Sequence, residues 1–218
     1  MRQHLLPHRR ASIGLAIATG LALLLPALPV HAQRAPRDLA AEQYVQVQAQ
    51  RVLQVLSDTS MSTADKIHTF RGVVDQIADV PRITRFVLGK YARTATPAQR
   101  QQFDALFRTY AQDVYETRLN EYHGESIRVV GSIVRNAGDV IVNSTVAGGK
   151  LDQPAHVGWR VMNDGAGWKI VDVEVSGVWL AITQQQDFVS TIDNAHGDVG
   201  VLIAQLQNDV KRHEAERR

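Results

Sequence analysis

Cysteine is absent from all 218 residues of the chain, and this absence excludes several kinds of chemistry. A protein without thiols has no disulfide framework and no thiolate nucleophile. It also lacks the cysteine that would carry a lipid anchor behind an export signal. Stability therefore has to come from a packed core, which a single domain of this length can supply.

An excess of charge of one sign is absent as well. The sequence has 24 Lys and Arg residues and 22 Asp and Glu residues. Three of the basic residues, Arg2, Arg9 and Arg10, precede residue 33, so the rest of the chain has 24 − 3 = 21 basic groups and 22 acidic ones. This balance excludes a domain-wide basic field, and we expect no nucleic-acid partner.

Residues 1–32 have the pattern of an export signal. A basic start is followed by an apolar run over residues 11–28 and by small residues that end at Ala32. Pro26 and Pro29 interrupt the run where a membrane-spanning helix would continue. We therefore expect cleavage after Ala32, a single domain over residues 33–210 and a charged, frayed tail over residues 211–218.

The first part of the mature chain has apolar residues every three or four positions, which is typical of amphipathic helices. The spacing predicts helices over residues 36–57, 63–77 and 81–89. A longer helix begins at TPAQ, residues 96–99, where threonine is a cap, proline fits the first helical position and glutamine can bond back to the cap.

From Glu125 the apolar period changes to two, which predicts strands. Four strands are expected, over residues 127–134, 140–146, 156–162 and 169–175, and the separators are rich in Gly and Asn, as in hairpin turns. Helical spacing returns after Gly177 and again after Gly197. In the last strand, alternation predicts a dry face of Val171, Val173 and Val175 and a wet face that includes Asp172 and Glu174.

This order predicts an α+β fold. We expect a twisted antiparallel sheet of about four strands with helices packed on one side, cone-like with an apolar cavity. Periodicity alone leaves open whether the cavity holds a guest or is filled by side chains.

Motifs for catalysis, metals and nucleotides are weak. Ser126 lacks the glycine pattern of a nucleophile elbow, and residues 165–167 form a hairpin turn rather than a phosphate loop. The histidines after residue 32 are not spaced as metal ligands: His68, His123, His156, His196 and His213. Asp172, Glu174 and His156 remain as candidate acid–base groups of a hydrolase or isomerase.

A locally basic region surrounds the predicted third helix. It consists of Arg82, Arg85, Lys90, Arg93 and Arg100. This region either meets anionic headgroups or an acidic partner, or is a solvated helix face.

The segment FVLGKYARTATPAQ, residues 86–99, and the apolar stripe over residues 103–110 resemble MlaC-type periplasmic phospholipid-binding proteins, also described as toluene-tolerance auxiliary proteins. Residues 168–178 and the helices after them are similar to the end of that family. Trp179 and residues 184–187 depart from the family pattern, which leaves room for its hopanoid-associated HpnM branch.

The resemblance implies a periplasmic carrier without cofactor or metal, and not an enzyme. Such a carrier shelters acyl tails in an apolar cavity and supports outer-membrane lipid asymmetry. It moves phospholipid between an outer-membrane lipoprotein complex and an inner-membrane ABC lipid transporter with its periplasmic lipid-binding component. We expect the lining among Phe86, Val87, Phe103, Phe107, Tyr110 and Val114 on helices and Val129, Val142, Trp159, Val161, Val171 and Val173 on strands.

Each of these residues fits ordinary core packing equally well. An interaction module with a filled core therefore stands as a third hypothesis beside the carrier and the enzyme.

The expected leader is directly testable. A full-length chain expressed in a Gram-negative host should yield a periplasmic product that begins at Gln33, because the small residues before it fit signal peptidase. Intact mass spectrometry measures the cleavage position. A product that retains residues 1–32 would contradict the assignment.

Overall fold

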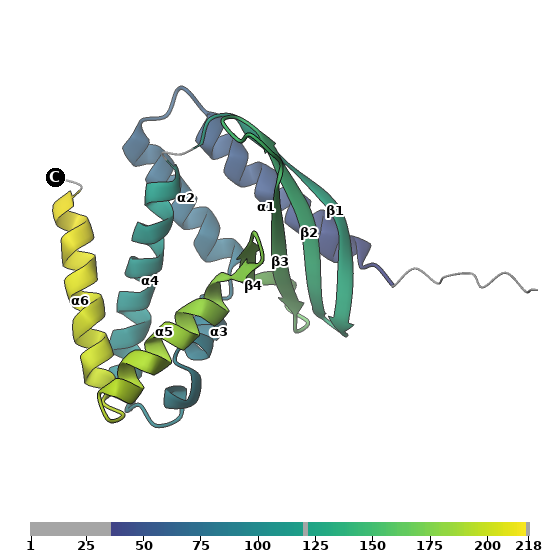
Figure 1. Ribbon diagram of the computed structural model, residues 1–218. Helices are drawn as coiled ribbons and strands as arrows, with labels where there is room; N and C mark the ends of the chain where they lie inside the picture. Colours follow the sequence, from purple (N-terminus) through teal and green to yellow (C-terminus); the bar gives the residue numbers. More distant parts are fainter. Residues whose placement is uncertain (1–35, 120–121, 217–218) are drawn as a thin grey trace, which may run out of the picture. The chain divides into compact units, whose positions relative to one another are not determined.

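The computed structural model describes residues 36–119 and 122–216 (Figure 1). The expected export signal lies outside the described residues. Within them, no helix has the length and apolar character needed to cross a membrane.

Each of the first three helices begins at a side-chain cap. In α1 (Leu39–Ser57), α2 (Thr63–Ile77) and α3 (Val80–Val87), the side chains of Asp38, Ser62 and Asp79 accept the backbone N–H groups of the third residue along. Such caps satisfy donors that have no partner within the helix.

The predicted capping box at α4 (Pro97–Leu119) is confirmed. Gln99 N donates to Thr96 Oγ1 at 3.2 Å, and Thr96 N donates to Gln99 Oε1 at 2.9 Å. A short 3-10 turn, η1 (Gly89–Ala92), leads into this helix. Gly89 has φ +55°, and a Cβ there would lie 2.7 Å from Val189 Cγ2, so a side chain is disfavoured where α5 (Leu180–Asn194) approaches.

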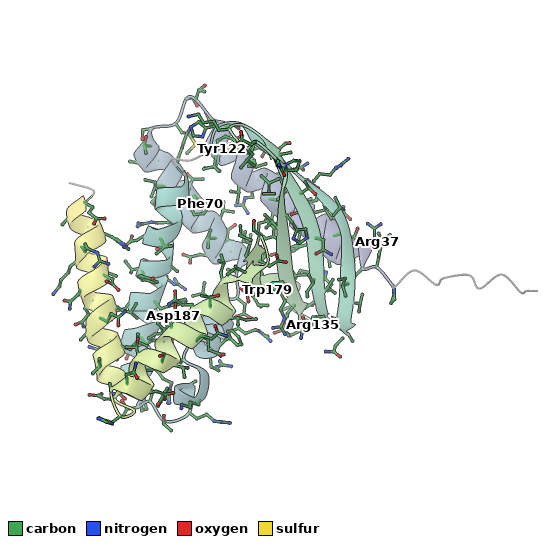
Figure 2. All side chains as sticks on the ribbon, viewed as in Figure 1. Arg37, Phe70, Tyr122, Arg135, Trp179 and Asp187 are labelled. Atoms are coloured by element: carbon green, nitrogen blue, oxygen red, sulfur yellow. The ribbon has the colours of Figure 1, made fainter. Side chains whose placement is uncertain are left out.

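The predicted meander is also confirmed. β1 (Glu125–Asn136), β2 (Asp139–Gly148), β3 (Ala155–Asn163), β4 (Trp168–Val175) and the short β5 (Val178–Trp179) pair antiparallel in sequence order in the described residues. β1 and β5 are thus the two edges of the sheet. Figure 2 shows Trp179 where β5 passes into α5.

The face assignment of β4 is wrong at its N-terminal half. Val161 pairs with Ile170 and Arg160 pairs with Asp172, so Val171 is the extra residue of a β-bulge. The bulge shifts the alternation by one residue. Ile170 therefore lies on the same apolar face as Val173, and Asp172 is buried at 7% exposure rather than wet.

The chain ends in two helices, α5 (Leu180–Asn194) and α6 (Val199–Glu216). α6 continues through Lys211 to Glu216, where the charge pattern predicted a frayed tail. Two contacts explain the longer helix. Val210 is buried, and the ring of His213 stacks on Tyr110 with 6.3 Å between centroids.

Two hydrophobic cores organise these elements. The sheet core lies between α1, α2 and one face of the sheet and is built from Ala41, Val45, Val73, Ile77, Val140, Val142, Val161 and Ile170. The helical core joins the end of α3 to α4, α5 and α6, and its largest buried side chains are Leu88, Phe103, Phe107, Phe188, Ile192, Leu202 and Leu206. In Figure 1, α1 lies along β1 and β2, and α6 lies beside α4.

The helical core can be tested at neighbouring positions of α6. Leu202 is fully buried and Val201 is 44% exposed. Leu202→Ala should lower the free energy of unfolding by about 2–5 kcal/mol because it leaves a cavity. Val201→Ala, the control, should change it by about 0.5 kcal/mol or less. Urea unfolding followed by circular dichroism measures both, and equal losses would contradict the burial of Leu202.

Candidate functional site

The helical residues predicted to line a cavity mostly lie in the helical core. Val87, Phe103 and Phe107 are buried there, and Tyr110 packs against them. Phe103 and Phe107 stack at 5.6 Å, and both meet Phe188 edge to face. This is a filled aromatic core, and it leaves these rings in contact with one another.

Two predicted helical residues lie elsewhere. Phe86 is 36% exposed, and its backbone carbonyl accepts a hydrogen bond from Gln185 Nε2 at 2.6 Å. Val114 is half-buried on α4. Neither belongs to the buried part of the helical core.

The predicted strand residues gather in the sheet core. Val142 and Val161 are fully buried, whereas Val129, Trp159 and Val173 are half-buried against them. Val171 is buried at the bulge and is not a member of this core. The structure therefore divides the predicted lining between two cores instead of bringing it to one wall.

The residues that face the strands come from α1 and α2, which the predicted lining omits. They are Ala41, Tyr44, Val45, Val52, Val73 and Ile77. The apolar stripe of the first helix was visible in the sequence. The sequence could not show that this stripe packs on the sheet. Periodicity gives the apolar face of a helix and not the surface that the face covers.

The apolar surface that remains half-open borders the sheet core. We call it the sheet-core rim; it consists of Tyr44, Val52, Val129, Val134, Trp159, Trp168 and Val173. Burial raises the pKa of Tyr44 to about 12, and the Tyr44 hydroxyl donates to Ile77 O at 3.0 Å. A dry surface with few polar groups, such as this one, suits an apolar guest.

The indole N–H of Trp159, in the rim, is satisfied within the protein. Trp159 Nε1 donates to Ser144 Oγ at 2.8 Å, and Ser144 Oγ donates to Val157 O at 3.0 Å. The indole is therefore fixed with its apolar ring against the sheet core.

Asp172, a candidate acid–base group, accepts hydrogen bonds from the backbone. Its Oδ1 accepts the backbone N–H groups of Val173 and Ala181, both at 2.8 Å, so it joins β4 to the first turn of α5. Burial raises the pKa of the Asp172 carboxyl, and these hydrogen bonds oppose the shift. Glu174 Oε1 instead lies 3.5 Å from Nδ1 of the half-exposed His156. Of the three groups proposed for a hydrolase, Glu174 and His156 therefore contact each other, whereas Asp172 is engaged by the backbone.

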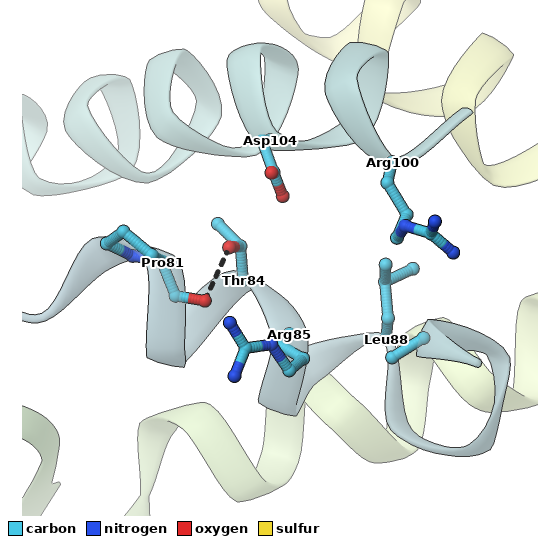
Figure 3. A pocket seen from close by; sticks show the side chains of 7 residues that line it. Pro81, Thr84, Arg85, Leu88, Arg100 and Asp104 are labelled. Atoms are coloured by element: carbon cyan, nitrogen blue, oxygen red, sulfur yellow. Dashed lines mark hydrogen bonds between the residues drawn. The ribbon is translucent and has the colours of Figure 1, made fainter. Parts of the chain in front are cut away.

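A pocket of about 310 Å³ lies between α3, η1 and α4, within the predicted basic region. Its walls are Pro81, Thr84, Arg85, Leu88, Ala92, Arg100 and Asp104 (Figure 3). Arg85, Arg100 and Asp104 bring charged groups to these walls, which does not suit acyl tails. The described residues include no group of three or more potential metal ligands.

The described residues thus form an α+β protein with an open antiparallel sheet, whose helix-covered face is bordered by partly buried apolar side chains. Comparison with known families then identifies the chain. The model of the MlaC protein family matches residues 46–208, and the chain belongs to this family.

A solved structure supports the same assignment. The chain is similar to the phospholipid-binding protein from Ralstonia solanacearum, whose structure was determined in complex with a phospholipid. The TM-score is 0.69 and the sequence identity is 27%, over 80% of this chain and 98% of the other. The predicted α+β class and the family resemblance are confirmed.

The role of Asp172 can be tested with two substitutions. Asp172→Ala leaves two buried N–H groups without their acceptor and should cost about 1–3 kcal/mol of unfolding free energy. Asp172→Asn keeps an oxygen acceptor and removes a buried charge, so its stability at pH 7 should equal or exceed that of wild type.

The two proteins should also differ in their pH dependence. Because the pKa of Asp172 is raised on folding, wild-type stability should fall as pH rises from about 3.9, the ordinary value, through the folded-state pKa. Asp172→Asn should lack this part of the dependence. Urea unfolding at several pH values measures it, and an unstable Asp172→Asn protein would contradict the buried-acceptor role.

Proposed function

We propose that this protein is a periplasmic phospholipid carrier that shelters acyl tails at the sheet-core rim. The observation that carries the proposal is the half-open apolar rim on the covered face of the sheet, in a member of the MlaC family. The phospholipid held by the similar Ralstonia solanacearum protein supports the choice of ligand.

The energetic reason for a carrier is the cost of exposing tails to water. Each methylene removed from water contributes about 0.8 kcal/mol, so two tails of about thirty methylenes would cost on the order of 20 kcal/mol in the aqueous periplasm. Val142 and Val161, both fully buried, form a floor on which tails can lie. The half-buried side chains around them offer the next contacts.

Entry of the tails requires the rim to widen. We infer that α1 and α2 move away from the sheet, because the sheet core is the place where apolar side chains of both walls meet. Contacts between side chains would be exchanged for contacts between side chains and tails. Since both kinds of contact are apolar, their exchange costs little compared with exposed tails. Movement of α1 would also break the hydrogen bonds of Gln46 to β1.

The direction of transport has to come from partner proteins, and their identity is suggested by the family. A bilayer and an apolar cavity solvate tails similarly, so transfer between them has little intrinsic direction. We propose that an outer-membrane lipoprotein complex and an inner-membrane ABC lipid transporter, with its periplasmic lipid-binding component, set the direction. The expected export signal would deliver the chain to that compartment.

The tail site can be tested on β4. Val173 is half-buried at the rim, whereas Val175, two residues further on, is 42% exposed. Val173→Asp should reduce the phospholipid that co-purifies per protein several-fold, because a carboxylate on this surface disfavours hydrocarbon. Val175→Asp is the matched control and should retain the wild-type content. Mass spectrometry of gently extracted periplasmic protein measures lipid identity and amount.

Two further measurements distinguish a loss of folding from a loss of lipid binding. Circular dichroism establishes whether Val173→Asp folds, and if it does not, Val173→Phe reduces the space for tails with an apolar side chain. Wild-type lipid content in both folded variants would exclude the rim as the tail site. Wild-type protein without any lipid would refute the carrier function, and hopanoid in place of phospholipid would assign the HpnM branch.

A further inference from the structure

A glutamine interrupts the apolar face of α1. Gln48 lies four residues after Tyr44 and four residues before Val52, and both of these neighbours belong to the sheet-core rim. Residues four apart on a helix differ by about 40° in direction, so Gln48 lies on the same face between them. Val45, three residues before Gln48, is 1% exposed in the sheet core. Gln48 is therefore a polar residue within the face of α1 that covers the sheet.

The amide oxygen of Gln48 is buried without a partner. The side chain as a whole is half-buried, and its Oε1 accepts no hydrogen bond. Rotation of the amide about its last bond exchanges Oε1 and Nε2, so the same buried position can present an acceptor or a donor. Either atom there needs a hydrogen-bond partner, because burial has removed the water that would supply one.

Other polar side chains of α1 are paired within the chain. Gln46 uses both of its amide atoms, since it accepts from Val129 N at 2.9 Å and donates to Ile127 O at 3.3 Å. The Tyr44 hydroxyl donates to Ile77 O at 3.0 Å. Gln48 lies among the same apolar side chains as Tyr44, but its buried oxygen has no such contact. It is a place in this wall where a bound molecule has a polar group to meet.

The lipid proposed for this site carries polar atoms next to its tails. Each acyl chain of a phospholipid is joined to glycerol by an ester, whose carbonyl oxygen accepts hydrogen bonds and donates none. A carbonyl that enters an apolar site loses its hydrogen bond to water. An amide N–H among the tails replaces that bond, and the Gln48 amide has two such hydrogens.

We propose that Gln48 positions the lipid by donating a hydrogen bond from Nε2 to an ester carbonyl, and that it thereby selects ester-linked lipids over ether-linked ones. The inference rests on the proposed function, because it requires tails to lie against the α1 side of the sheet core. Rotation of the amide brings Nε2 to the buried position when lipid is bound. The preference concerns the linkage and is independent of the headgroup.

The test compares two lipids that differ only at this linkage. The mature protein is incubated with detergent micelles that contain equal amounts of a diacyl phosphatidylethanolamine and of its dialkyl ether analogue with the same chain length. Mass spectrometry then measures both lipids on the repurified protein. Wild type should take up the ester in about fivefold excess, the ratio that corresponds to one neutral hydrogen bond.

Two methionine substitutions on α1 assign the preference to Gln48. Gln48→Met keeps a side chain of similar length and removes both amide atoms. It should load as much total lipid as wild type, with the ester-to-ether ratio reduced to about one. Gln50→Met, at an exposed position of the same helix, is the matched control and should keep the wild-type ratio. A wild-type ratio in Gln48→Met would overturn the proposal.

Stability distinguishes a lipid contact from a structural role. After lipid extraction, Gln48→Met should unfold at the same urea concentration as wild type or at a higher one, because it removes a buried acceptor that has no partner. Circular dichroism measures the transition. A destabilised or unfolded Gln48→Met protein would show that the glutamine serves the fold, and the proposal would be wrong.

The same loading assay distinguishes failure of this inference from failure of the carrier function. Wild-type protein that takes up both lipids equally is still a carrier, but Gln48 then does not select by linkage and its amide is met by water. Wild-type protein that takes up neither lipid refutes the carrier function and this inference together.

Discussion

The fold depends on covering one apolar face of an open antiparallel sheet. α1 does this with hydrogen bonds as well as apolar contacts. Gln46 of α1 accepts from Val129 N at 2.9 Å and donates to Ile127 O at 3.3 Å, so its amide occupies the position that a further strand would take beside β1. Nearby, Ser132 donates to Glu42 at 2.7 Å, and the Arg37 guanidinium holds the pKa of that carboxyl below its usual range. An edge strand that would otherwise pair with another chain is thereby closed.

The helical core and the sheet core differ in the side chains that build them. The helical core is dense with stacked aromatic rings, and it holds α3, α4, α5 and α6 as a unit. The sheet core is built from smaller side chains and is bordered by half-open ones. Asp172 connects the two parts through the first turn of α5. A guest that enters at the sheet would therefore meet the sheet core and its half-open border, and not the aromatic rings of the helical core.

The buried charged side chains of the sheet mainly hold neighbouring segments together. Arg160 donates two hydrogen bonds to Asp139 at 3.0 and 2.9 Å, and this guanidinium lowers the pKa of the Asp139 carboxyl. Together with Asp172, these groups lie on the face of the sheet opposite the sheet core. Each of these groups is engaged by a neighbour.

Local features of this protein were determined by its sequence alone. The capping box at Thr96 and the hairpin turns act over a few residues, and the period of apolar positions is a property of each element by itself. Three features required the tertiary structure: the bulge at Val171, the burial of Asp172 and the pairing of α1 and α2 with the sheet. Each arises from contacts between segments far apart in the chain. The period of the apolar positions predicts which residues are buried. Which segments cover them, and which of the covering side chains remain partly exposed, is decided by the packing of the whole chain.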